Sequence, residues 1–114
     1  VEPDAAPAIQ ASVRAGRPVT APGPASTMGR LDCKEPSHLA LGELAREADH
    51  LVTVTDDEVA ETVALLASHG IDTTPSGAAG VAAVHHAGTL RGRLGLDAGS
   101  HVLAIVTEGP EDSP

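Results

Sequence analysis

The sequence contains no phenylalanine, tyrosine or tryptophan in its 114 residues, so its core must be built from valine, leucine, isoleucine and alanine. Hydrophobic residues still make up 41% of the chain, which is enough for one small domain. A purely aliphatic core of this size predicts only marginal stability for the chain alone. The missing aromatic rings also argue against a binder of single-stranded nucleic acid, because such proteins stack bases on aromatic side chains.

Positive charge is scarce as well. Seven lysines and arginines face 16 acidic residues, and the formal net charge is −9. A field of this sign repels phosphate backbones and anionic membranes, so we expect neither nucleic acid nor membrane as a partner. No apolar run approaches the roughly 20 residues that a membrane-spanning helix needs.

Cysteine is rare in this sequence, and the opening residues do not resemble a signal peptide. Cys33 is the only cysteine, which excludes an internal disulfide and indicates a reducing compartment, the cytoplasm. The opening residues, VEPDAAPAIQ, have neither the basic region nor the apolar region of a signal peptide. The chain does not begin with methionine, and its first two residues resemble the end of a strand already under way. We therefore expect a fragment of a longer protein.

Periodicity and capping residues predict helices that alternate with short strands. We expect helices over residues 4–15, with Asp4 as the cap, over 36–48 and over 55–69, and a fourth that begins at Pro75. The expected strands are 1–2, 19–21, 51–54 and the apolar run 101–106. This order predicts an α/β fold with a mostly parallel sheet and flanking helices over residues 1–109, followed by a disordered acidic tail over 110–114.

Residues 71–88, IDTTPSGAAGVAAVHHAG, are the most informative stretch. Thr74 can cap a helix and Pro75 suits its first position, while Ser76 and Gly77 begin a run of small residues. Small side chains leave backbone N–H groups uncovered at the positive end of the helix dipole, which favours an anion or a polar ring atom. They also allow close packing on a sheet, and the pattern alone leaves both interpretations open.

Other familiar sites are poorly supported. The six histidines contain no HExxH or HxxxH pair, and the adjacent His85 and His86 would point about 100° apart on a helix. The chain has neither the GxSxG elbow of a serine hydrolase nor a G-x-G-x-x-G fingerprint. Thr107 is the better candidate, because a hydroxyl that follows the apolar run VLAIV would lie at the carboxyl edge of the sheet, where ligands bind.

Taken in order, the segments VEP, TMGRLDCKEPS, ADHLVTVTDDEVAETVALL, TPSGAAGVAAV and VLAIVTEG resemble the C-terminal half of fold-type II pyridoxal-phosphate enzymes. This superfamily includes threonine and serine dehydratases, serine racemase, threonine synthase and diaminopropionate ammonia-lyase. CKEPSHLALGEL and TEGPED are most similar to the diaminopropionate ammonia-lyases, whereas VTVTDDEV is equally similar to dehydratases and racemases. The resemblance implies part of the large cofactor domain and pyridoxal 5'-phosphate as the cofactor.

The resemblance also implies roles for particular residues. Thr107 corresponds to the hydroxyl that hydrogen-bonds the pyridine nitrogen, and Ser76 and Gly77 correspond to the S-G-A segment beside the ring. Glu35 and Ser37 belong to the segment on the substrate side of the pocket. Glu2 resembles the first carboxylate of a cation site, although the second carboxylate of that site is replaced by alanine at position 8.

The departures concern catalysis. The Schiff-base lysine, the asparagine loop and the glycine-rich phosphate cradle of the family lie in an N-terminal half that this sequence does not contain. Lys34 is the only lysine, and its context does not suit that role. We therefore expect one wall of a lyase site that eliminates ammonia or water from a small amino acid, inactive without the missing half, in a homodimeric parent. A non-catalytic interaction domain of the same fold, and a racemase or threonine synthase, are the alternatives.

Overall fold

Helices dominate the computed structural model, which describes residues 1–111. In chain order the elements are β1 (Glu2–Pro3), α1 (Ala8–Ala15), α2 (His38–Glu47), β2 (Thr53–Val54), α3 (Asp56–Ser68), α4 (Pro75–His85) and the 3-10 helix η1 (Gly88–Arg91). The two strands pair in parallel, with Glu2 opposite Thr53 and Pro3 opposite Val54. This confirms the expected α/β fold class, although the sheet within these residues is only two strands wide.

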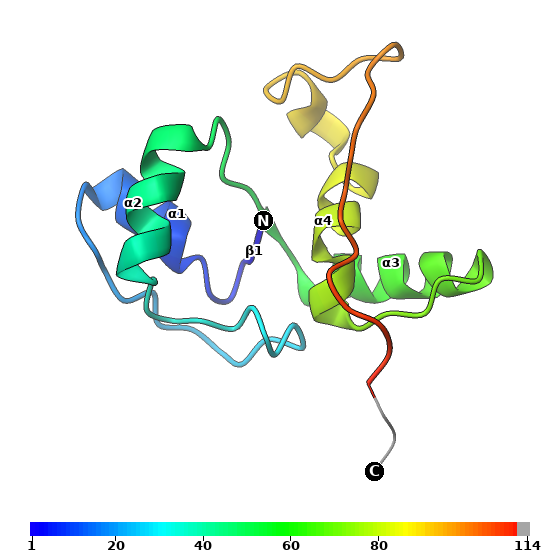
Figure 1. The fold of residues 1–114 in the computed structure, drawn as a ribbon, viewed down its shortest axis with the longest axis horizontal. Coiled ribbons are helices and arrows are strands. Elements are labelled where there is room, and N and C mark those ends of the chain that lie inside the picture. The colour runs from blue at the N-terminus through cyan, green and yellow to red at the C-terminus, as the bar shows by residue number, and fades with distance from the viewer. Residues whose placement is uncertain (112–114) are drawn as a thin grey trace.

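The molecule is flat, and its helices lie on two sides of the short sheet. Helices α1 and α2 pack together at one end, and α3 packs on α4 at the other, with the strands between them (Figure 1). The principal extents are 43 × 41 × 21 Å, and the radius of gyration of 14.5 Å exceeds the roughly 13 Å typical of a compact domain of this length. No helix within residues 1–111 combines the length and apolar character needed to cross a bilayer.

The core lies where α3 and α4 meet β2. It contains one methionine, two valines and three alanines, namely Met28, Val54, Val59, Ala78, Ala79 and Ala82. Alanine on α4 brings the two helices close together, which partly compensates for the absence of aromatic side chains. Small side chains also bury little apolar area, so the expectation of marginal stability applies to this core.

Local capping explains where the helices begin. Thr55 and Glu58 form the predicted capping box of α3, with Thr55 N–H donating to Glu58 Oε1 at 2.9 Å and Glu58 N–H donating to Thr55 Oγ1 at 3.1 Å. Thr74 caps α4, and Pro75 occupies its first turn as predicted. Ser37 caps α2, so this helix begins two residues later than expected from Pro36.

Two expectations about α1 and its neighbourhood are wrong. Asp4 does not cap α1, which begins only at Ala8. Instead, the carboxylate of Glu2 accepts backbone N–H groups at the start of α1, although Glu2 lies six positions before the first residue of this helix. Residues 19–21 form no strand, since only Ala21 N–H bonds to a neighbouring backbone, at Lys34 O (2.8 Å).

The largest correction concerns residues 101–106. We expected a buried strand, but the segment has no strand pairing and runs in extended form past α4 (Figure 1). Leu103 is 88% exposed and Ile105 is 66% exposed. An apolar run becomes a buried strand only when other strands and helices cover it, and residues 1–111 provide no such neighbours. Part of the predicted tail, residues 112–114, lies outside the described residues.

Candidate functional site

The first turn of α4 holds a buried hydroxyl. Ser76 is only 8% exposed, and its Oγ accepts the backbone N–H of Arg30 at 3.1 Å. Within residues 1–111 the Ser76 hydroxyl hydrogen has no hydrogen-bond acceptor. A hydroxyl held in place by one bond, with its own hydrogen free, can donate to an acceptor atom brought against this end of the helix.

The C-terminal segment crosses α4 at this same turn. Glu108 O accepts from Thr73 Oγ1 at 2.6 Å, and the Glu108 carboxylate accepts from the Thr74 hydroxyl and the Arg30 guanidinium. Arg30 therefore bonds to both Ser76 and Glu108. Sequence reasoning did not identify Arg30 as a site residue, because its role depends on partners 46 and 78 positions away.

Gly77 allows the two segments to approach. A Cβ at this position would lie 2.2 Å from Thr73 Oγ1 and 3.1 Å from Glu108 O. The Gly77 N–H donates to Thr74 Oγ1 at 3.1 Å, so it is not an open donor. At this residue the small side chain serves close packing, the second of the two interpretations that the sequence left open.

Thr107 lies next to Glu108 but remains exposed, and its hydroxyl makes no hydrogen bond within residues 1–111. The structure thus brings Ser76, Gly77 and Glu108 together and leaves Thr107 beside them on the solvent side. Its role toward a ring nitrogen stays a prediction.

A cavity of about 190 Å³ brings together three of the other predicted residues. Glu2, Glu35 and Ser37 all line it, and Arg30 contributes to its wall. The cavity lies between the start of α1 and residues 30–37. Because Arg30 also contacts Ser76 and Glu108, it connects this cavity to the first turn of α4.

The side chains around this cavity already have structural partners. Both oxygens of the Glu2 carboxylate accept backbone N–H groups of α1, from Ile9 at 2.7 Å and Gln10 at 3.0 Å. Ser37 Oγ accepts Ala40 N–H at 3.3 Å. No group of three or more potential metal ligands occurs within residues 1–111, so Glu2 has no companions there for a cation.

Lys34 is fully engaged in structural bonds. Its ammonium donates to Ala5 O (3.0 Å), Pro24 O (2.7 Å) and Asp32 Oδ1 (2.5 Å). The hydrogen bond from Lys34 holds the pKa of the Asp32 carboxyl below its ordinary value. An ammonium with all three hydrogens donated is a poor nucleophile, and the chain has no second lysine.

Comparisons with known proteins identify one family and two solved structures of similar fold. Residues 1–108 match the family described as pyridoxal-phosphate dependent enzyme. The crystal structure of a threonine deaminase from T.th. superposes with a TM-score of 0.71 and 25% identity, covering 78% of this chain and 31% of that one. Maize serine racemase superposes with a TM-score of 0.66 and 24% identity over 72% of this chain and 26% of that one, which shows a shared fold. No curated protein matches the sequence.

The chain therefore spans less than a third of the length of these two structures. Its family match nevertheless extends over nearly all of its residues, and its fold agrees with theirs. The chain belongs to the family of pyridoxal-phosphate-dependent enzymes.

Proposed function

We propose that this chain is the C-terminal part of a pyridoxal-phosphate-dependent lyase that eliminates ammonia or water from a small amino acid, such as 2,3-diaminopropionate, serine or threonine. The family match supports the cofactor, and the likeness to a threonine deaminase supports β-elimination. The segment CKEPS, which resembles diaminopropionate ammonia-lyases, supports ammonia as a leaving group.

The buried hydroxyl of Ser76 is the observation that carries the proposal. Pyridoxal phosphate has a ring nitrogen that accepts a hydrogen bond, and the hydroxyl hydrogen of Ser76 has no acceptor within residues 1–111. The residues therefore fit the cofactor. When bound, the cofactor supplies an electron sink for a carbanion at the substrate Cα. A neutral hydroxyl partner leaves the ring nitrogen largely unprotonated, which moderates that sink and suits loss of a β-substituent.

Two hydroxyls compete for this role. Ser76 is buried and fixed by Arg30 N–H, whereas Thr107 is exposed. The Arg30–Glu108 ion pair and the Thr74–Glu108 hydrogen bond fix the segment that carries Thr107 against α4. Its buried position favours Ser76 as the donor to the ring nitrogen, and Thr107, which the family resemblance assigns to that atom, is the alternative partner.

The cavity lined by Glu35 and Ser37 is the proposed substrate side. Glu35 is exposed, so its carboxylate is free to bind a cationic amino group of a substrate. All three substrates carry an α-amino group, but 2,3-diaminopropionate has a second amino group on its β-carbon, where serine and threonine have a hydroxyl. Glu35 would therefore favour the diamino acid.

The covalent anchor of the cofactor belongs to the remainder of the parent, since Lys34 is engaged in three structural bonds. We further propose that the parent is a homodimer. The single cysteine, Cys33, is exposed and unpaired, which supports a reducing compartment such as the cytoplasm.

Reconstitution tests this proposal. The chain would be combined with the preceding part of the parent polypeptide, and ammonia release from 2,3-diaminopropionate, serine and threonine would be measured with and without pyridoxal phosphate. Cofactor-dependent release by the combined parts, and none by the chain alone, is the expected result. Release by the chain alone would contradict the assignment of the anchor, and cofactor binding without turnover would favour a non-catalytic domain.

Variants separate the two hydroxyls in the same assay. Ser76→Ala and Thr107→Val each remove one donor, and Thr107→Ser restores the second. Loss of a single hydrogen bond to the ring should weaken cofactor binding by roughly five- to tenfold, corresponding to about 1–1.5 kcal/mol. If both substitutions leave cofactor affinity unchanged, neither hydroxyl contacts the ring nitrogen.

A further inference from the structure

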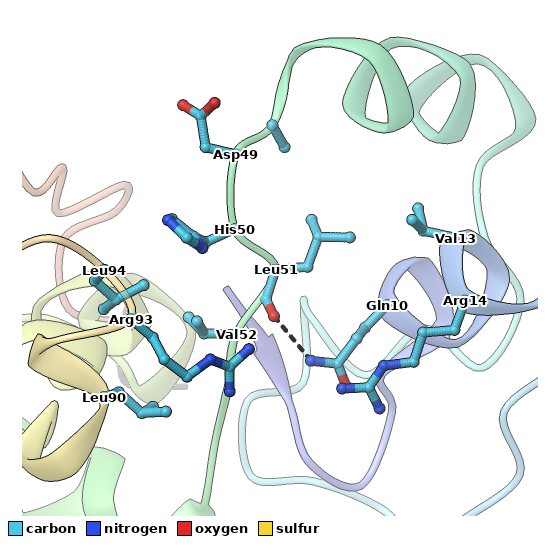
Figure 2. Close-up of a pocket in the computed structure, with 11 residues that line it drawn as sticks. Gln10, Val13, Arg14, Asp49, His50, Leu51, Val52, Leu90, Arg93 and Leu94 are labelled. Carbon is cyan, nitrogen blue, oxygen red and sulfur yellow. Dashed lines mark hydrogen bonds between the residues drawn. The ribbon is translucent and has the colours of Figure 1, made fainter.

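A separate cleft lies at the opposite end of α4 from Ser76. Its volume is about 240 Å³, and it is lined by residues of α1, by residues 48–52 before β2, and by Leu90, Arg93 and Leu94 at and after η1 (Figure 2). Gln10 Nε2 donates to Leu51 O at 2.8 Å, which fixes one wall. Because the 11 residues of α4 rise about 1.5 Å each, roughly 15 Å separates the two ends of this helix. The cleft is thus distinct from the proposed cofactor site.

Two arginines face each other across this cleft. Arg14 extends from the last turn of α1 and Arg93 from the residues after η1, and their guanidinium groups point toward one another (Figure 2). Both also line an adjoining hollow of about 330 Å³ that reaches Thr53. Both arginines are exposed, so water and salt screen the repulsion between them, and an anion bound between them would remove what remains.

Carboxylates of the described chain do not neutralise this pair. Three other cationic side chains form ion pairs with carboxylates, namely Arg30, Lys34 and Arg46. Within residues 1–111, neither Arg14 nor Arg93 does so, although the chain has 16 acidic residues and only seven lysines and arginines. Arg17 and Arg91 form no such pair in this part of the chain either, but they lie outside the cleft.

One acidic residue lines the same cleft. Asp49 belongs to its wall, but in Figure 2 its carboxylate points away from both guanidinium groups. His50 is the other titratable neighbour. In the view of Figure 2 the uncharged side-chain amide of Gln10 lies between Arg14 and Arg93, and residues 1–111 supply this pair with no anion.

We propose that Arg14 and Arg93 form a binding site for a small oxyanion with two negative charges, a phosphate group or a dicarboxylate. The planar guanidinium group donates two parallel hydrogen bonds to such oxygens, and two of them would clasp one anion.

The anion would add a connection between the two ends of the molecule, beside the β1–β2 pairing and the Gln10–Leu51 hydrogen bond. Arg14 belongs to the end that carries α1 and α2, and Arg93 follows α4 at the other end (Figure 1). Binding therefore stabilises their arrangement in proportion to ligand concentration above the dissociation constant. This site is independent of the proposed lyase activity.

Nuclear magnetic resonance of the 114-residue chain tests the site. The probes are inorganic phosphate and succinate, added at constant ionic strength with chloride as the exchange ion, and the signals are the Arg Nε–H groups and the backbone amides of Gln10, Leu51 and Arg93. We expect saturable shifts confined to the cleft, with a dissociation constant near 1 mM or below, roughly. Stronger binding of phosphate than of succinate identifies a phosphate site, and the reverse order a dicarboxylate site.

Matched variants distinguish a built site from general charge attraction. Arg14→Gln and Arg93→Gln should each weaken binding at least tenfold, whereas Arg17→Gln and Arg91→Gln, which remove the same charge outside this cleft, should leave it within about twofold. Arg14→Lys keeps the positive charge near the end of α1 but removes the two parallel N–H donors of the guanidinium group, so it should also weaken binding. The spectrum of this variant serves as the control that the fold is retained. Equal weakening by all four glutamine variants, or shifts that never saturate, would overturn the proposal.

Discussion

Two glycines of the same helix, Gly77 and Gly80, should respond to alanine in opposite ways. A Cβ at residue 77 would lie 2.2 Å from Thr73 Oγ1 and 3.1 Å from Glu108 O, whereas at residue 80 the nearest atom would be Ile105 O at 3.8 Å. The first distance is impossible without movement, and the second is an ordinary van der Waals contact. The pair therefore separates the effect of packing from that of helix propensity.

The magnitudes decide the sign at each site. Alanine is favoured over glycine by up to about 1 kcal/mol inside a helix, so Gly80→Ala should stabilise the chain by a few tenths to about 1 kcal/mol. At residue 77 the Thr73 side chain must turn away, which forfeits its bond to Glu108 O, worth about 1 kcal/mol. Overpacking against the Glu108 backbone adds roughly 1–3 kcal/mol. Gly77→Ala should therefore be net destabilising by about 1–3 kcal/mol.

Chemical unfolding followed by far-ultraviolet circular dichroism measures both variants, because the chain has no aromatic fluorophore. Backbone chemical shifts of residues 105–108 report whether the C-terminal segment still lies on α4. We expect a lower midpoint and changed shifts for Gly77→Ala, and a higher midpoint with unchanged shifts for Gly80→Ala. If Gly77→Ala is as stable as the parent and the shifts of residues 105–108 are unchanged, the close approach of Glu108 to α4 is refuted.

The remaining predictions concern three charged groups that hold neighbouring segments in place. Glu2→Gln should weaken the hydrogen bonds that residue 2 accepts from the N–H groups at the start of α1, and so destabilise the chain by about 1 kcal/mol. Glu35→Gln, which changes a residue on the same cavity, should leave stability unchanged, and equal unfolding midpoints for the two variants would contradict this reasoning. The Ser26 hydroxyl and the Thr27 N–H lower the pKa of Asp56, so its carboxylate stabilises the fold above the ordinary aspartate pKa, and this stability is lost as pH falls through the lowered value. Asp56→Asn should therefore be less stable than the parent at neutral pH and converge with it in acid, which paired pH–stability curves would show. Lys34→Met removes three hydrogen bonds and should lower the unfolding free energy by about 1–3 kcal/mol; an unchanged midpoint in urea would show that these bonds contribute nothing.

The sequence determined the features that depend on neighbouring residues. The capping box of α3 and the Thr74–Pro75 start of α4 both follow from residues a few positions apart. The ordered set of family segments also identified the cofactor family, which the match over residues 1–108 confirmed.

Tertiary structure alone decided the features that join distant segments. Glu2 caps α1 because the turn after β1 brings its carboxylate to the helix, and Arg30 connects Ser76 to Glu108 across 46 and 78 positions. Residues 101–106 carry the apolar pattern of a buried strand, yet burial depends on what covers a segment and not on the segment itself. Local sequence fixes capping and helix starts through short-range hydrogen bonds, whereas burial and site geometry arise only when the chain folds back on itself.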